Sequence, residues 1–184
     1  MPNKFINELN YDKKPYDSFD KGPAKIGYVN DLSNVVTTGG SFYNSSTITT
    51  AAINTKYVVP TPTTVYAEGM GYASNTIVLV EPGTYSFDFT IQVFKNNITT
   101  EGSLSAWLEV DSVAQDYTCN TISLAISNQI SVLTLHSHVV TTAANTRVGL
   151  AYAANSTDMQ LRTSAASSPY PAIAAVTLEV DRIR

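Results

Sequence analysis

Charge is scarce in this sequence of 184 residues. Only 14% of the residues are Asp, Glu, Lys or Arg, and the formal net charge is −4. A chain with a negative balance has no general attraction to the phosphates of nucleic acids or to an anionic membrane surface. Nucleic acid is therefore not an expected partner.

Cysteine is almost absent, since Cys119 is the single one in the chain. One thiol cannot close a disulfide within the chain, so stability has to come from core burial or from neighbouring subunits. No Lys, Arg or His lies near Cys119 in the sequence to activate its thiol. We expect a small buried residue or a strand residue at this position.

Long apolar runs are missing as well. No stretch approaches the roughly 20 apolar residues that a helix needs to cross a bilayer. The first residues, MPNKFINELNYDKK, lack the apolar region of a secretion signal. We expect a protein made in a host cytoplasm, without a membrane span and without signal-directed export.

Motifs of catalysis and cofactor binding are also lacking. The sequence has no Gly-x-Ser-x-Gly, no phosphate-binding glycine loop and no calcium-loop spacing. The acids Asp88, Glu109, Asp111, Asp116 and Asp158 are scattered singly, whereas a glycosidase needs two paired carboxylates in a cleft. The sequence predicts a protein that is not an enzyme and that needs no cofactor.

The two histidines, His136 and His138, are two residues apart on an expected strand. Their side chains should point to the same face and could share a metal ion with a third ligand. The sequence has no further histidine, so only a symmetry axis could complete such a site. We therefore expect a structural or surface role and no metal site.

The residues that are abundant favour strands. Thr, Ser, Asn, Val, Ile and Tyr are common, whereas the strong helix formers are scarce. Along residues 84–94 apolar and polar side chains alternate over a full strand length, so one face is apolar. This pattern predicts an all-β domain with a central core strand whose inward residues are Tyr85, Phe87, Phe89, Ile91 and Val93.

The same alternation predicts other strands. Weaker strands are expected at 46–53, 56–59, 64–67, 76–80, 118–126 and 158–163. About eight to ten strands without a blade-length repeat favour a two-sheet sandwich. The further inward residues are Leu104, Ala106, Leu108 and Val110; Leu133, Leu135 and Val139; Val148, Leu150 and Tyr152; and Val176, Leu178 and Val180, with Trp107 and Glu109 outward.

The amino-terminal segment differs in kind from the rest. Residues 1–31 hold five of the eleven Lys and Arg and five of the fifteen Asp and Glu. Prolines and glycines interrupt any long element there. We expect an arm over residues 1–40 that contacts a docking partner, followed by a sandwich domain over 41–184. The apolar residues of the arm are Phe5, Ile6, Leu9, Tyr11, Tyr16 and Phe19.

The run Glu81-Pro82-Gly83-Thr84-Tyr85-Ser86-Phe87-Asp88-Phe89 resembles the Pro-Gly-x-Tyr-x-Phe signature of complement-type and tumour-necrosis-factor-like jelly rolls. The resemblance covers roughly residues 60–184. It implies a jelly-roll head that forms homotrimers, and related heads decorate bacteriophage and viral particles as fibres, spikes or vertex proteins. The expected function is a bacteriophage virion protein, such as a head fibre, spike or capsid decoration protein, attached to the capsid shell by its arm.

Two alternatives remain open. One is a penton or vertex protein built into the shell as a pentamer. The other is a lectin-like module that binds a host surface glycan through tyrosines near predicted turns. These are Tyr43, Tyr66, Tyr72, Tyr117 and Tyr170. In any of these assemblies Trp107, a large aromatic on a polar strand face, is the expected subunit contact.

Overall fold

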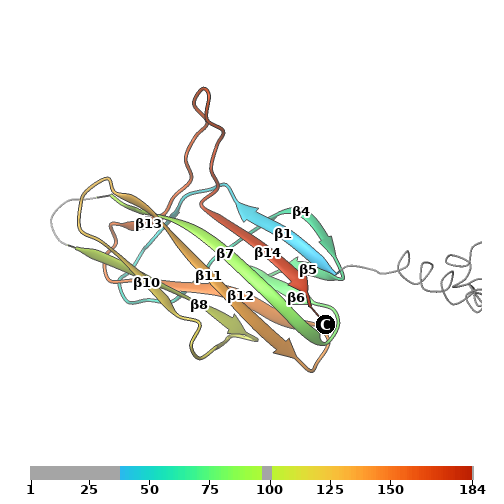
Figure 1. The fold of residues 1–184 in the computed structure, drawn as a ribbon. Coiled ribbons are helices and arrows are strands. Elements are labelled where there is room, and N and C mark those ends of the chain that lie inside the picture. The colour runs from blue at the N-terminus through green and yellow to red at the C-terminus, as the bar shows by residue number, and fades with distance from the viewer. Residues whose placement is uncertain (1–37, 97–100, 184) are drawn as a thin grey trace, which may run out of the picture. The chain divides into compact units, whose positions relative to one another are not determined.

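The computed structural model describes residues 38–96 and 101–183, and these residues form strands and loops without a helix. The all-β prediction is confirmed (Figure 1). No described helix could therefore span a membrane. The predicted arm residues Phe5 to Phe19 lie outside the described part. The strands are β1 (Gly39–Asn44), β2 (Ile48–Thr49), β3 (Tyr57–Val58), β4 (Thr63–Glu68), β5 (Met70–Ala73), β6 (Thr76–Leu79), β7 (Gly83–Lys95), β8 (Gly102–Val110), β9 (Val113–Ala114), β10 (Asn120–Leu124), β11 (Ile130–Thr141), β12 (Thr146–Ala154), β13 (Met159–Leu161) and β14 (Val176–Arg182).

The strands form two antiparallel sheets in a sandwich-like arrangement (Figure 1). Sheet A has the order β2-β13-β7-β14-β1-β4, and β11 pairs along the other edge of β7. Sheet B has the order β10-β8-β12-β6-β5, with β3 on β12 and β9 on β8. The described residues thus contain fourteen strands rather than eight to ten. Most of the additional strands are short and lie at the margins of the two sheets.

Eight of the strands pair in a nested series. Taken in chain order, β1 pairs with β14, β6 with β12, β7 with β11, and β8 with β10. The first strand of the series thus pairs with the last, the second with the seventh, the third with the sixth and the fourth with the fifth. Each pair brings together residues that are far apart in sequence, except for the innermost one.

The core lies between the two sheets, and β7 supplies its centre. Tyr85, Phe87, Phe89, Ile91 and Val93 are each 2% exposed or less, as their alternation predicted. Their burial contributes about 8–15 kcal/mol before chain entropy, as an upper bound. The inward residues predicted for the other strands are also buried, with the exception of Val110, which is half-buried.

Three sequence expectations differ from the structure. Glu109 points outward from sheet B as expected, yet it is buried because Lys56 and Arg147 lie around it. Cys119 is exposed in the loop before β10, neither buried nor in a strand. Gly39 and Gly40, which the sequence assigned to the arm, belong to β1.

Packing explains the glycine at position 40 of β1. A Cβ on Gly40 would lie 2.7 Å from Cε2 of Phe42 and 2.9 Å from Sδ of Met70. The strand therefore needs a residue without a side chain, although glycine weakens strand propensity. Gly69 lies between β4, at the edge of sheet A, and β5, at the edge of sheet B. Its φ of 71° allows the chain to turn from one sheet to the other.

Candidate functional site

A row of polar side chains crosses the exposed face of sheet A. The strand register places His136 opposite Asp88, Asp88 opposite Glu179, and Glu179 opposite Ser41. Nδ1 of His136 lies 2.6 Å from Oδ1 of Asp88, and the Ser41 hydroxyl donates to Oε2 of Glu179 at 3.0 Å. Asp88 is thus not the isolated acid that the sequence suggested. We call these four residues the polar row.

His138 lies beside the polar row, on the same face as His136, as predicted. The two imidazole rings meet edge to face with centroids 5.2 Å apart. Within the described ranges, no group of three or more His, Cys, Asp or Glu is arranged to hold a metal ion. The two histidines therefore have no third ligand within one described chain.

The chemistry of the polar row is that of a solvated surface. The side chains of His136 and Asp88 are 60% and 56% exposed, so water screens their interaction. An orienting carboxylate beside an imidazole is part of many catalytic sites, but such a site also needs a nucleophile bonded to the imidazole. The hydroxyl of the row, on Ser41, donates to Glu179 instead.

Carboxylates dominate the exposed face of sheet A. Glu68, Asp88, Glu179 and Asp181 all lie on it and are exposed. On strands β1, β4, β7, β11 and β14, no described residue of this face is Lys or Arg. Two copies of this face would repel each other if they were stacked directly.

Trp107 lies on the outer face of sheet B, opposite Ala151 of β12. It points away from the core as predicted, and it is half-buried. Two residues along the strand, the buried Glu109 carboxylate contacts Nζ of Lys56 at 2.8 and 3.0 Å. A small cavity of about 40 Å³ lies beside this ion pair, which is room for water but not for a larger ligand.

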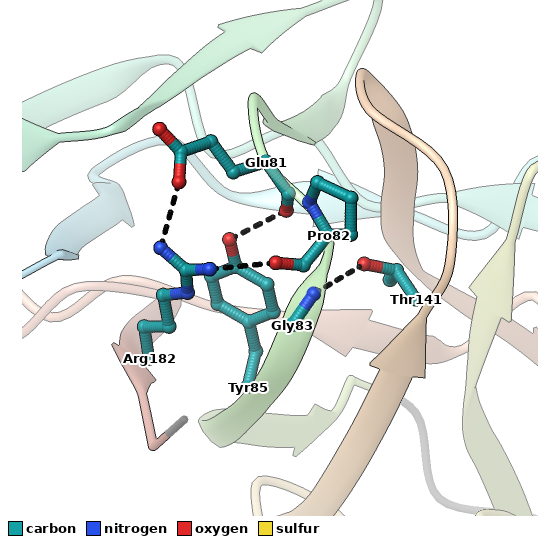
Figure 2. Close-up of polar contacts among 6 residues, drawn as sticks. All are labelled: Glu81, Pro82, Gly83, Tyr85, Thr141 and Arg182. Carbon is teal, nitrogen blue, oxygen red and sulfur yellow. Dashed lines mark hydrogen bonds and ion pairs between the residues drawn. The ribbon is translucent and has the colours of Figure 1, made fainter.

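The Pro82-Gly83 turn, where the resemblance was found, is a junction of three strands (Figure 2). The guanidinium of Arg182 donates to Oε1 of Glu81 at 2.9 Å and to the carbonyl of Pro82 at 2.7 Å. The amide of Gly83 donates to the hydroxyl of Thr141 at 3.2 Å. The end of β14 and the end of β11 are therefore both tied to the start of β7.

Tyr85 completes this junction from the core side. Its ring is fully buried, and its hydroxyl donates to the carbonyl of Glu81 at 2.8 Å, which satisfies the phenol's polar end (Figure 2). Burial raises the pKa of Tyr85 above its ordinary value of 10.0, and Glu81 raises it further, while Arg182 opposes the shift. The role of this cluster is structural, because its hydrogen bonds and ion pair join the residues drawn in Figure 2 to one another.

A protruding finger, residues 164–173, leaves the sandwich between β13 and β14 (Figure 1). Ser164 and Ile173 exchange two backbone hydrogen bonds of 3.0 and 2.9 Å, and Ser167 pairs with Tyr170 closer to the tip. Tyr170 is 71% exposed. The finger is therefore an ordered projection that presents an aromatic ring to solvent.

The base of the finger borders an open cavity. Gln92 donates from Nε2 to the Arg162 carbonyl and to Oγ of Ser164, and the Arg162 guanidinium lies 3.9 Å from the centroid of the Phe94 ring. The cavity has a volume of about 380 Å³, which is within the range of small-ligand sites. It is lined by Phe94, Asn128, Ile130, Arg162, Thr163, Ser164 and Ala165.

The tyrosines that the sequence placed near turns divide into two groups. Tyr43, Tyr66 and Tyr72 lie within strands β1, β4 and β5, each within two residues of the end of its strand. Tyr117 and Tyr170 lie in loops and are exposed. The cavity beside the finger was missed, because its lining comes from three segments that only the strand register brings together.

No family model matches this chain, and no curated protein matches it either.

The pKa shift of Tyr85 gives a test of the junction. The folded state favours the neutral phenol of Tyr85. The contribution of this phenol to the free energy of unfolding is therefore complete below pH 10, and it is lost as the pH rises through 10 and above. We expect Tyr85→Phe to lower the free energy of unfolding at pH 7 by about 1 kcal/mol, and to make its decline above pH 10 less steep. Urea unfolding at pH 7 to 11 measures both effects.

Tyr152, whose pKa burial also raises, remains in the variant, so some alkaline sensitivity should persist. An unchanged slope above pH 10 in Tyr85→Phe would contradict the assignment.

Proposed function

We propose that this protein is a structural, non-enzymatic component of a bacteriophage particle. In this proposal it is a homo-oligomeric jelly-roll head on the virion surface, in the manner of a head fibre, spike or capsid decoration protein. Its amino-terminal arm, the part of residues 1–40 that precedes β1, binds the capsid shell. The arm's contact residues are Phe5, Ile6, Leu9, Tyr11, Tyr16 and Phe19.

The nested strand pairing carries this proposal. A jelly roll can be described as one long antiparallel hairpin that is rolled over into two sheets, so that its outermost strands pair first with last. The pairs β1–β14, β6–β12, β7–β11 and β8–β10 follow this order. Jelly rolls of this kind are typical of viral capsid and lectin domains.

The surface of the sandwich also supports an assembly role. Large apolar side chains are exposed at many points, among them Val65, Tyr117, Ile126 and Val140, each more than 60% exposed. Charged residues are few, and interfaces between subunits are depleted in charge. These exposed side chains are available for contacts with neighbouring subunits.

A lectin-like function is the second candidate, and the cavity beside the finger is the observation that favours it. Its lining includes the polar side chains of Arg162 and Asn128, which can hydrogen-bond to sugar hydroxyls. The exposed ring of Tyr170 projects from the same finger. A virion head that also binds a host glycan would combine both functions.

Deletion of residues 2–22 tests the attachment role of the arm. We expect the truncated protein to be soluble and to keep its β-sheet circular dichroism, because the described core lies wholly within residues 38–183. It should fail to join particles when it is supplied in place of the full-length protein. Incorporation of the truncated chain at the normal level would contradict the proposal.

Trp107→Ala tests the subunit contact. If the outer face of sheet B meets a neighbouring head, removing the indole should weaken association by at least about tenfold, since buried aromatic anchors dominate interface energies. Sedimentation velocity of the full chain measures the effect and also gives the number of subunits. Tyr170→Ala, on the finger, is the matched control.

A trimer would agree with the expected symmetry, and a pentamer would favour the penton alternative. An unchanged sedimentation profile in the Trp107 variant, with circular dichroism showing a folded chain, would remove this residue from the interface.

A further inference from the structure

Strand β11 forms an unusually long open edge of sheet A. All twelve of its residues pair with β7 along one side, and no other described strand pairs along its second side. The other outermost strands in the described part have six residues or fewer, and β4 is also interrupted by a bulge against β1. Short or irregular edges resist pairing with other chains, whereas long regular ones invite it.

The sequence of β11 lacks the usual protection of an exposed edge. Its twelve residues, ISVLTLHSHVVT, include no Pro, Lys, Asp or Glu. The side chains on its solvent face alternate with the buried ones, and Ile130, Val132 and Val140 are 48%, 54% and 71% exposed. This edge therefore combines apolar side chains that stand in water with a backbone that pairs with no other described strand along its second side.

One hydrogen bond shows which backbone groups face the open side. Nδ2 of Asn120 donates to the carbonyl of Thr134 at 3.1 Å, from the direction of sheet B. Because backbone groups alternate between the two sides of a strand, the even-numbered residues from 130 to 140 direct their N–H and C=O groups to the open edge. These groups are a template for a further antiparallel strand.

We infer that two copies of this chain join along β11, strand against strand, about a two-fold axis near Leu135. In this register Ile130 lies opposite Val140 of the partner subunit, Val132 opposite the partner's His138, and Thr134 opposite the partner's His136. Apolar side chains at the two ends of the strand thus meet each other. The six facing pairs would exchange up to about ten backbone hydrogen bonds, because the Thr134 carbonyl of each copy already accepts from Asn120.

Charge favours a second copy of the chain in this arrangement. The nearest carboxylate of the polar row, on Asp88, is one strand away from the edge. Across the junction the two Asp88 residues would be separated by three strand spacings, about 14 Å, which exceeds the Debye length of about 8 Å at physiological ionic strength. Stacking sheet A face to face would instead press eight carboxylates together.

The contact is distinct from the one proposed for Trp107. Trp107 lies on the outer face of sheet B, whereas β11 is an edge strand of sheet A. A head can therefore use both surfaces at once, and β11 would link one head oligomer to the next. The inference needs only the described sandwich, so it does not depend on attachment to a capsid.

A cross-linking experiment on the full chain tests the register. Cys119 is exposed, so it is first changed to Ser. One preparation then carries Ile130→Cys and another carries Val140→Cys. In the proposed pairing these positions face each other about 5.5 Å apart, within disulfide reach, whereas two copies of either position are about 34 Å apart.

With oxidised glutathione we expect a disulfide-linked dimer in the mixture and none in either preparation alone. Equal cross-linking in the separate preparations, or none in the mixture, would overturn the inference.

A charge substitution provides the second readout. Val132→Lys places a cation on the pairing edge, and we expect the dissociation constant of the paired form to rise at least tenfold in sedimentation equilibrium. Val65→Lys is the matched control, because Val65 is 66% exposed on β4 at the opposite side of sheet A. A similar constant for both variants, with both chains folded by circular dichroism, would contradict pairing through β11.

Discussion

The burial of one face of β7 is the constraint on which the rest of the structure depends. Five inward side chains, from Tyr85 to Val93, fill the space between the sheets. A shift of this strand by one residue would turn all five into water and bring Ser86, Asp88 and Thr90 into the core. The register of β7 is thus strongly determined, and β11, β13 and β14 take their positions from it.

The surfaces of functional interest follow from that register. The polar row exists because Asp88 is held between His136 and Glu179 on the two neighbouring strands. The cavity beside the finger exists because Gln92 and Phe94 emerge on the outer face, where the chain after β13 covers them. The open edge of β11 also follows from the register of β7, because β7 pairs with β11 along one side and leaves the other side of β11 open. One buried strand therefore positions the sites on the whole of sheet A.

Much of the fold could be predicted from local patterns, and the reason is the regular alternation of its main strands. The period-two patterns around Leu104, Leu133, Val148 and Leu178 gave correct inward residues because each of these strands is apolar on one side only. Strand β1 escaped prediction because Gly39 and Gly40 carry no alternating pattern. The requirement for glycine is set by later contacts, with Asp181 and Val180 at Gly39 and with Phe42 and Met70 at Gly40. Local sequence does not contain that information.

The candidate sites were less predictable than the fold. The bond between Asp88 and His136 joins residues 48 positions apart, and nothing in either segment indicates their pairing. Glu109 was expected to be solvated on the outer face, yet Lys56 from a distant loop covers it. Such features depend on register and on loop paths, which composition and periodicity do not determine. The junction at the Pro82-Gly83 turn lies within the segment that carries the resemblance, but no sequence pattern indicated Arg182 as its partner.

Electron cryo-microscopy of the assembly that holds this chain tests the central claim most directly. The full chain would be isolated from its native host through a tag placed after Arg184. We expect particles whose outer surface carries two-layered β-sandwich densities grouped around symmetry axes, with the amino-terminal segment reaching the shell. A chain recovered only as free monomers, or as part of an assembly that has no shell, would contradict the account.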